Sequence, residues 1–341
     1  MKKIRIQDAI GSVLCHDMTR IVKDEMKDAA FRKGHIIREE DIPVLLSMGK
    51  EHVYVYEKKE GMIHENDAAI ILSGLCINDN MKLTEVKEGK VEIVADCHGF
   101  FQVDVEKLNQ INELEDIMIA TRSGNLPVKP GDKLAGMRVI PLIVEKEKLN
   151  KAKAIGGNKS ILKITPFKKL KAGIVTTGNE VYYGRIKDTF TPVIKEKLSN
   201  QGIEVIKHTI CNDDTEVIKK AVMETKAAGA EIIICTGGMS VDPDDLTPAA
   251  IKASGAEIIS YGAPVLPGAM FLLGYFEDET AILGVPGCAM YKKITIFDIV
   301  LPYIAAGIEI SKKDIAKLGY GGLCLDCEIC HYPNCQFGKG V

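Results

Sequence analysis

The segments KAGIVTTGNE, residues 171–180, and EIIICTGGMS, residues 231–240, each run from an apolar stretch into a glycine turn. An unbroken apolar stretch of this length is typical of a parallel strand that is covered on both faces. We therefore expect strands at Ala172–Thr176 and Ile232–Cys235, each followed by a Thr-Gly or Thr-Gly-Gly turn. The two segments indicate a buried parallel sheet.

Further strands and helices alternate from about Thr165 onward. Two helices are expected to begin at Thr191-Pro192 and Thr247-Pro248, because Thr caps a helix and Pro fits its first turn. The other expected elements are strands at Ile203–His208, Glu257–Ser260, Met270–Gly274 and Ala281–Val285, a helix with Val217, Ile218, Ala221 and Val222 on one face, and a last helix over Met290–Ile304. This alternation predicts an α/β domain whose mostly parallel sheet lies between two layers of helices.

The first 164 residues predict a smaller, mixed α+β region. A helix around residues 39–49 and a strand at His52–Tyr56 are expected to precede a boundary in the charged loop Glu57–Glu60. Beyond it we expect short strands at Lys90–Ala95 and Gly99–Val103 and a helix at Val105–Leu114, and we interpret Lys151–Lys159 as a linker. The expected parts are a strand-helix-strand segment (1–57), a small mixed β-rich domain with its linker (58–164), the α/β domain (165–310) and a cysteine-rich tail (311–341).

Composition and charge exclude several classes of protein. The 341 residues carry 44 Lys plus Arg against 47 Asp plus Glu, a formal net charge of −3, and no long basic run, so nucleic acid is not an expected partner. The start, MKKIRIQDAIGSVLC, lacks the apolar core of a signal peptide, and no apolar stretch approaches the length of a membrane span. We expect a cytoplasmic protein.

Three strand ends carry the side chains that a ligand site needs. They are Thr176–Glu180, Cys211–Asp214 and Thr236–Asp245. In open α/β sheets, ligands bind outside the carboxyl ends of the strands. Glycine turns there expose backbone N–H groups to anions, and neighbouring carboxylates suit a Mg²⁺ ion that bridges to phosphate oxygens.

Each of these motifs alone also has an ordinary structural explanation. The Gly237-Gly238 pair can be simply a turn, and Asp213-Asp214 can be simply the N-cap of the next helix. Asp242, Asp244 and Asp245 can form a solvated acidic loop. The combination of three such motifs, in order, on one α/β frame favours a site.

Residues 166–305 resemble the molybdopterin-binding domain shared by the molybdopterin adenylyltransferases and the molybdopterin molybdotransferases. Thr177-Gly178-Asn179-Glu180 is similar to the family's Thr-Gly-Asp-Glu turn, and Gly237, Gly238, Ser240 and Asp245 match its Gly-Gly-X-Ser-Val-Gly-X-X-Asp loop. The resemblance implies a three-layer α/β molybdopterin-binding domain that binds the pterin dithiolene and its phosphate with Mg²⁺.

The same resemblance implies roles for individual residues. Glu180, Asp213 and Asp245 would be the acidic, catalytic residues. The residues expected to bind the pterin are Thr177, Gly178, Asp188, Thr236, Gly237, Gly238, Ser240, Pro267, Gly268, Pro286 and Gly287. The implied partners are the small-molecule pterin substrate and other cofactor-biosynthesis proteins or a molybdoenzyme, and the implied assembly is a homodimer.

The chain also departs from the family. Residues 31–56 are similar to a segment that normally runs directly into the pterin domain, but here about 110 residues separate the two. The family's Asp-Gly-Tyr-Ala loop is absent, its Lys-Pro-Gly-Lys-Pro loop has lost both lysines at Val265–Met270, and Phe190 stands where Asn is common. Its Leu-Pro-Gly-Asn-Pro turn becomes Val285–Ala289. Because charge-assisted contacts are among the stronger polar interactions, these losses leave pterin binding better supported than catalysis.

Four of the ten cysteines lie in the last eighteen residues, as Cys324-X2-Cys327-X2-Cys330-X4-Cys335. Ligation by four cysteines serves both zinc and a [4Fe–4S] cluster. The closely spaced Cys-X2-Cys-X2-Cys run favours iron–sulfur slightly over zinc, His331 could replace one ligand, and a reduced tail without metal is the third alternative. Cys235 and Met239 are expected in the core, while Cys288 either packs or lines the pocket.

The sequence therefore predicts a protein of molybdenum or tungsten cofactor biosynthesis, a molybdotransferase-like transferase that supports metal insertion. Two alternatives stay open. One is a pterin-binding carrier or sensor without catalysis. The other is a nucleotide pyrophosphatase or deamidase, because related domains occur in such proteins.

Overall fold

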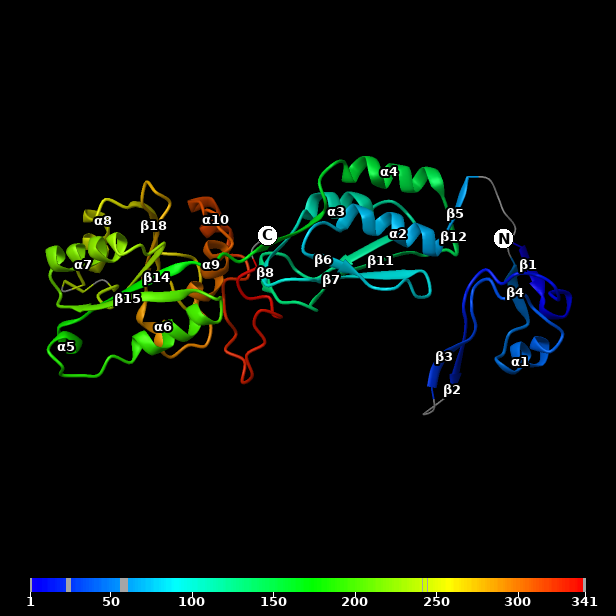
Figure 1. The fold of residues 1–341 in the computed structure, drawn as a ribbon, viewed down its shortest axis with the longest axis horizontal. Helices are drawn as coiled ribbons and strands as arrows, with labels where there is room; N and C mark the ends of the chain where they lie inside the picture. Colours follow the sequence, from blue (N-terminus) through cyan, green and yellow to red (C-terminus); the bar gives the residue numbers. More distant parts are fainter. Residues whose placement is uncertain (1, 23–25, 56–60, 241, 244, 340–341) are drawn as a thin grey trace. The chain divides into compact units, whose positions relative to one another are not determined.

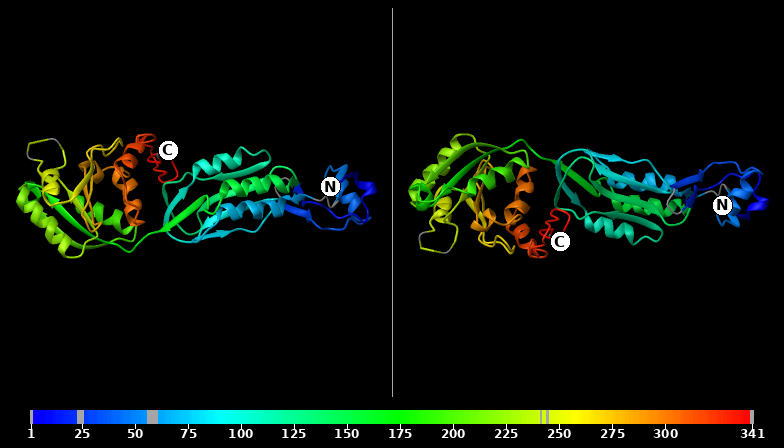
Figure 2. Two further views of the ribbon diagram at one scale, coloured as in Figure 1. Left: turned by 90° about the horizontal axis from the view of Figure 1, so that it is seen from above. Right: turned by 90° about the horizontal axis from the view of Figure 1, so that it is seen from below.

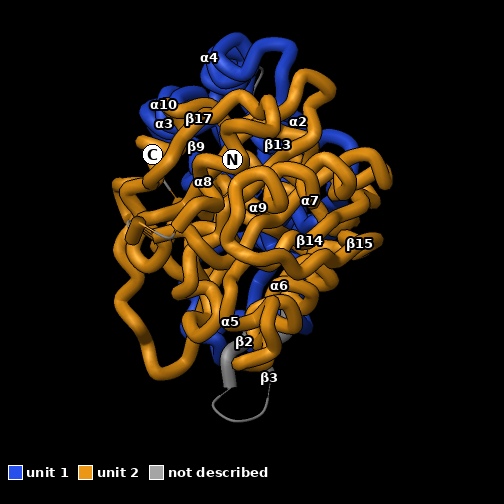
Figure 3. The backbone as a smooth tube through the Cα atoms, turned by 90° about the vertical axis from the view of Figure 1, so that its left-hand side faces the viewer, with its two compact units in different colours: residues 1–96, 103–122, 130–163 blue, residues 97–102, 123–129, 164–341 orange. Residues whose placement is uncertain are grey.

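The computed structural model describes residues 2–22, 26–55, 61–240, 242–243 and 245–339. The chain divides into two compact units, shown in blue and orange in Figure 3. Unit 1 comprises residues 1–96, 103–122 and 130–163, and unit 2 comprises residues 97–102, 123–129 and 164–341.

Unit 2 is built on a six-stranded sheet with the order β15-β14-β16-β19-β18-β17 (Figure 1). Its strands are β14 (Lys171–Thr177), β15 (Glu204–Cys211), β16 (Ile232–Thr236), β17 (Glu257–Tyr261), β18 (Leu272–Tyr275) and β19 (Ala281–Val285). The first four in this order are parallel, and β18 runs antiparallel to both of its neighbours. The predicted mostly parallel α/β sheet is confirmed.

Helices cover both faces of this sheet (Figures 1 and 2). They are α6 (Phe190–Ser199), α7 (Thr215–Ala227), α8 (Thr247–Ala253) and α9 (Ile296–Ala305). Because side chains alternate along a strand, Ile232 and Ile234 pack with α6 and α9, whereas Ile233 and Cys235 pack with α7 and α8. Cys235 and Met239 are buried there, as expected.

Two predicted element boundaries in unit 2 are wrong. The last helix does not begin at Met290. Residues Gly287–Met290 form a 3-10 turn, and α9 begins only after Thr295, whose side chain forms a capping box with Asp298. The strand expected to end at His208 continues to Cys211, because β14 pairs with it along its full length.

A small sheet with the order β10-β8-β13 is formed by Leu126–Val128, Gly99–Val103 and Leu162–Pro166, and most of these residues belong to unit 2. The ring of Phe100 in β8 lies 4.2 Å from the ring of Tyr303 in α9, and Phe100 is fully buried. Two short pieces of the middle of the chain therefore complete the α/β unit. After α9, the helix α10 (Lys312–Lys317) leads into the tail.

Unit 1 contains a four-stranded sheet of order β6-β7-β11-β9. Its strands are Met81–Leu83, Lys90–Ala95, Lys133–Val139 and Ile117–Thr121, and its helices are α2 (Glu65–Cys76), α3 (Val105–Asn112) and α4 (Lys146–Gly156). The linker expected at Lys151–Lys159 is wrong up to Gly156, because these residues form the second half of α4, in which Ala152 is buried. Gly157, with a φ of 61°, ends the helix.

The N-terminal part of unit 1 has a small core of its own. Its elements are β1 (Lys2–Arg5), η1 (Ile6–Asp8), β2 (Met18–Val22), β3 (Met26–Phe31), α1 (Asp41–Ser47) and β4 (His52–Val55), and β5 (Met62–His64) follows and pairs with β12 (Ile143–Glu145). The expected helix and strand are confirmed as α1 and β4. Tyr56 and the boundary loop Glu57–Glu60 lie outside the described residues. Within the ranges that the structure describes, every helix is too short or too polar to cross a membrane.

Candidate functional site

The order of the strands creates a switch point in unit 2. From β14 the chain crosses to β15 on one side and then returns to β16 on the other side of β14. In open α/β sheets, the carboxyl ends of strands that part in this way border a ligand-binding crevice. The turns Thr177-Gly178 and Thr236-Gly237-Gly238 lie at these two strand ends, where Thr176 is paired with Thr236.

Close packing requires the two glycines of the loop that follows β16. Gly237 has a φ of 88°, and a Cβ there would collide with the carbonyl oxygen of Thr177. A Cβ on Gly238 would lie 2.8 Å from the hydroxyl of Thr247, which is itself 2.9 Å from the hydroxyl of Thr177. The Gly-Gly pair is therefore more than a surface turn, because it lets the ends of β14 and β16 meet.

A buried network of hydroxyl groups lies beside these turns. The Thr176 and Thr191 hydroxyl oxygens are 3.0 Å apart, and His208 Nε2 lies 3.1 Å from both. The Thr236 hydroxyl donates to that of Thr176 at 3.3 Å. Burial lowers the pKa of His208. Sequence reasoning missed His208, because its partners come from other elements and show no local spacing.

Asp188 begins α6 beside this network. Its Oδ1 accepts hydrogen bonds from the amides of Phe190 at 2.9 Å and Thr191 at 3.0 Å. Its Oδ2 is buried without a hydrogen bond and lies 3.6 Å from His208 Nε2. Burial alone would raise the pKa of Asp188, but hydrogen bonds from Thr191 and Phe190 hold that pKa below its usual range. The carboxylate is therefore charged, and its buried Oδ2 faces His208.

The loop after β14 and the loop after β15 are joined by hydrogen bonds. The Asn179 amide, at the start of the short helix α5 (Asn179–Tyr182), donates to Asp213 Oδ2 at 2.8 Å, and the Asp213 amide donates to Asn179 Oδ1 at 3.4 Å. The N-cap of α7 is Asp214, whose Oδ1 accepts from two amides at 3.0 Å each. The N-cap explanation thus applies to Asp214 and not to Asp213. Glu180 is exposed.

The third loop continues into a turn around Asp245. The Asp245 amide donates to the carbonyl of Asp242 at 3.0 Å, and Asp245 Oδ2 accepts from the Asp242 amide at 3.3 Å. The hydroxyl of Tyr261 donates to the carbonyls of Met239 and Ser240, both at 3.3 Å. Burial, and then the charge of Asp245, raises the pKa of Tyr261. Tyr261 is a second residue that sequence reasoning missed. Val241 and Asp244 of the predicted loop lie outside the described residues.

Two further loops border the same end of the sheet. Pro286-Gly287 follows β19, whose last residue, Val285, pairs with Thr236 of β16. Pro267 accepts a hydrogen bond from the amide at the start of α9 at 3.3 Å, and a Cβ on Gly268 would press on the side chain of that residue, Ile296. The half-buried Cys288 has a pKa raised by burial.

No three His, Cys, Asp or Glu side chains of the described ranges are gathered closely enough to hold one metal ion. The side chains concerned include Glu180, Asp213 and Asp245 of the loops and the four cysteines of the tail. A Mg²⁺ ion at the loops would therefore need oxygen ligands from the substrate, as Mg²⁺ sites commonly do.

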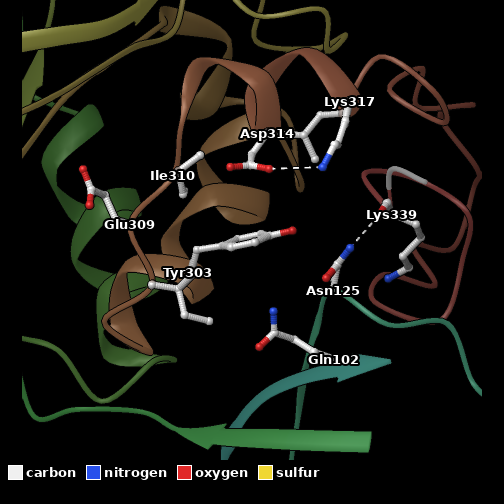
Figure 4. Close-up of a pocket in the computed structure, with 10 residues that line it drawn as sticks. Gln102, Asn125, Tyr303, Glu309, Ile310, Asp314, Lys317 and Lys339 are labelled. Atoms are coloured by element: carbon white, nitrogen blue, oxygen red, sulfur yellow. Dashed lines mark hydrogen bonds and ion pairs between the residues drawn. The ribbon is translucent and has the colours of Figure 1, made fainter. Parts of the chain in front are cut away.

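Two cavities of unit 2 involve the tail and the last two helices, and the first of them lies beside the loop that contains Leu266 and Pro267. One, of about 550 Å³, is lined by all four tail cysteines. The other, of about 260 Å³, lies between α9, α10 and the small sheet (Figure 4). In it Asp314 and Lys317 form an ion pair of 3.4 Å, and the Asn125 side chain donates to the carbonyl of Lys339 at 3.4 Å.

Comparison with known proteins gives two family matches. Residues 173–306 match the family described as "Probable molybdopterin binding domain". Residues 3–57 match a family described as "Domain of unknown function (DUF8806)".

Three individual relatives illustrate the similarity. The molybdopterin molybdenumtransferase of Haemophilus influenzae is 28% identical over 152 residues, which cover 42% of this chain and 37% of that protein. A CinA-like protein of a Mycobacterium species (strain MCS) is 38% identical over 90 residues, 26% of this chain and 21% of that protein. The structure of the tungsten cofactor synthesizing protein MoaB from Pyrococcus furiosus is 21% identical, with a TM-score of 0.33, over 39% of this chain and 90% of that chain. The chain therefore spans little more than a third of the molybdenumtransferase it matches.

Proposed function

We propose that this chain, whose residues 173–306 belong to the molybdopterin-binding domain family, binds molybdopterin or its adenylylated form and acts in molybdenum or tungsten cofactor biosynthesis. The observation that carries the proposal is the pair of glycine turns, at Gly178 and at Gly237-Gly238, on the two strands that border the switch point. A pterin phosphate needs backbone N–H groups that it can approach closely, and the partly exposed Gly237 and Gly238 offer such an approach.

The buried hydroxyl groups keep these turns in place before a ligand arrives. Thr176 is bonded toward α6 through Thr191, and Thr177 is bonded toward α8 through Thr247. Fixing the loops in advance reduces the conformational entropy that binding would otherwise cost. The buried network therefore supports a preformed phosphate site.

The acidic residues suit Mg²⁺ of the substrate-bridging kind. Mg²⁺ in nucleotide sites takes one or two carboxylates and completes its shell with phosphate oxygens and water. We assign Glu180, Asp213 and Asp245 to this ion, because each follows or precedes a strand-end turn. When bound, the ion would supply Lewis-acid stabilisation of the charge on a phosphoanhydride.

We infer a molybdotransferase-like activity that supports metal insertion in the cytoplasm, with a cofactor-biosynthesis protein or a molybdoenzyme as the recipient. The alternative is a carrier or sensor that binds the pterin without turnover. The loss of both lysines at Val265–Met270 favours this alternative. Hydrolysis of adenylylated molybdopterin in the presence of molybdate separates these two forms.

The test is Mg²⁺-dependent release of AMP from adenylylated molybdopterin, measured without oxygen. We expect Asp245→Asn to lower the rate roughly 100-fold, because it removes a carboxylate from the ion. Asp242→Asn, in the same turn, is the matched control and should keep the rate. Full turnover by Asp245→Asn would overturn the assignment of this residue. Binding without turnover by the unmodified protein would leave the carrier.

A second candidate is hydrolysis of a nucleotide phosphoanhydride. It rests on the family resemblance alone, because related domains occur in nucleotide pyrophosphatases and deamidases. A panel of nucleotides and dinucleotides incubated with Mg²⁺ tests it. Turnover of a nucleotide by a preparation that binds no pterin would replace the first proposal.

A further inference from the structure

The tail forms a closed loop that contains all four of its cysteines. The Gly338 amide donates to the carbonyl of Gly321 at 3.0 Å, which joins the two ends of the loop. A Cβ on Gly321 would lie 2.9 Å from the carbonyl oxygen of Gln336, so the two strands of the base are in close contact. The four cysteines are therefore confined to one loop of fewer than twenty residues.

This loop is fixed to the α/β unit along two sides. The amide of Leu266 donates to Gly322, and the amide of Cys324 donates to Leu266, both at 2.8 Å. On the other side the Tyr332 hydroxyl donates to the carbonyl of Asp298 at 3.3 Å, and Phe337 is buried in the core. The ion pair of Lys292 with Asp326, at 2.9 Å, adds a third connection.

The loop and residues 291–294 border an open cavity of about 550 Å³, and all four cysteines lie on its wall. Cys324 and Cys335 are half-buried and pack against the core, whereas Cys327 and Cys330 are exposed. Apolar side chains, among them Ile294, Leu323 and Tyr332, form much of the remaining wall. The cavity thus offers four sulfur ligands in a mainly apolar shell.

We propose that this cavity holds a [4Fe–4S] cluster ligated by Cys324, Cys327, Cys330 and Cys335. Such clusters are held by four thiolates, commonly in a close Cys-X2-Cys-X2-Cys run with one more cysteine. The apolar wall beside Cys324 and Cys335 limits the access of solvent on that side of the cluster, whereas Cys327 and Cys330 lie on the exposed side.

Zinc fits the same residues less well. Four thiolates around zinc, at about 2.3 Å from the ion, meet in a compact tetrahedron that leaves no free volume between them. In the structure all four cysteines instead border one cavity of about 550 Å³, which has room for a multi-atom cluster.

The cluster lies next to the loop that precedes Pro267-Gly268. Leu266 is bonded both to Gly322 and to Cys324, so the cluster's first ligand is one hydrogen bond away from that loop. The assignment of the cluster does not rest on the pterin proposal. Measuring pterin in the same preparations shows whether either proposal fails alone.

The test is purification of the full chain without oxygen, followed by assays of iron, acid-labile sulfide and zinc. We expect about four iron and four sulfide per chain, with visible absorption that dithionite bleaches. Cys327→Ser and Cys330→Ser should each lose most of the iron. Both positions are exposed, so these substitutions remove no buried packing. Cys97→Ser, outside the tail, is the matched control and should keep the iron.

One equivalent of zinc without sulfide would overturn the cluster in favour of a mononuclear site. A chain without metal, even after reconstitution with iron and sulfide, would also overturn it. Circular dichroism of each variant shows whether its secondary structure is kept. If one variant loses both iron and secondary structure, the other variant and reconstitution of the unmodified chain with iron and sulfide test the cluster instead.

Discussion

Thr176 and Thr177 are adjacent in β14, and their hydroxyls reach opposite faces of the sheet. The first lies 3.0 Å from Thr191 in α6, and the second lies 2.9 Å from Thr247 in α8. All four side chains are nearly or fully buried. A buried hydroxyl without a partner costs about 1–3 kcal/mol, so these pairs fix both helices to the same strand end.

At the same scale, three wholly or partly buried histidines predict how stability depends on pH. Burial lowers the pKa of His208, and also those of His16 and His64. Below a pH of about 6.5, these histidines therefore bind more protons in the unfolded chain than in the folded chain. We expect the free energy of unfolding, measured with denaturant, to fall as the pH is lowered from 7.5 through this range.

His208→Gln should reduce that fall, because it removes one of the three groups and keeps a hydrogen-bonding partner for Thr176 and Thr191. If the free energy of unfolding instead rises as the pH is lowered, the assignment of three imidazoles with lowered pKa values is contradicted. An unchanged profile in the variant would remove His208 from the explanation.

The glycines of the loops could be predicted from the sequence, since a Thr-Gly turn after an apolar strand is a local pattern. His208 and Tyr261 could not, because their partners lie in other elements, 17 to 32 residues away along the chain. Asp213 and Asp214 show the intermediate case. The sequence predicted an N-cap or a site for the pair, and the structure separates the two residues.

Among the elements, β14 and α7 pack unusually closely at one glycine. A Cβ on Gly173 would collide with Cγ2 of Thr225 in α7. Overpacking of this kind costs about 1–3 kcal/mol, so we expect Gly173→Ala to lower the free energy of unfolding by about 2 kcal/mol. Denaturant unfolding of the purified variant measures this.

Thr225→Ser should restore much of that loss in the double variant, because it removes Cγ2 and keeps the hydroxyl that donates to Ala221. Gly136→Ala is the control, since a Cβ there meets nothing nearer than 3.7 Å in another strand. If Gly173→Ala and Gly136→Ala lower the free energy of unfolding equally, the loss comes from replacing any glycine in a strand and not from the contact with Thr225.

The start of α9 depends on a buried ion pair. Asp298 Oδ1 lies 2.6 Å from Lys197 Nζ, and both side chains are only 11% exposed. Burial raises the pKa of Asp298, although the lysine opposes this. Lys197→Met leaves a buried carboxylate unpaired, and we expect it to cost about 3 kcal/mol at neutral pH.

That cost should shrink as the pH is lowered, because protonation of Asp298 removes the unpaired charge. The comparison is denaturant unfolding of the variant and the unmodified chain at several pH values. A cost that stays constant with pH would mean that lost packing of the lysine stem, rather than charge, explains the effect.

At this scale, sequence patterns predicted the elements better than their ends. Alternating apolar strands and Gly-terminated helices gave the six-stranded sheet and its two helical layers. The prediction of a linker at Lys151–Lys159 was wrong up to Gly156, because its polar residues belong to the exposed side of α4, while Leu149 and Ala152 are buried. The start of α9 failed because the capping box at Thr295 is stronger than the apolar residues before it.

For the whole molecule, the sequence indicated a division near residue 165, and the structure adds two earlier pieces to the α/β unit. Residues 97–102 and 123–129 join it through β8 and β10. Local pattern could not predict this, because the partners of these strands lie far along the chain. The match to the molybdopterin-binding family begins only at residue 173, so these pieces are additions to the matched domain.

The central claim is that unit 2 binds a pterin at the turns of β14 and β16. The most direct measurement is the pterin content of the chain, purified without oxygen from cells that make the cofactor and then oxidised to a fluorescent derivative. We predict near-stoichiometric pterin in the unmodified chain. Gly237→Ala should lose most of it, because its Cβ displaces the end of β14. Gly202→Ala, at a helix end with open space around it, should retain it. Absence of pterin from the unmodified chain, in cells that make the cofactor, would contradict the claim.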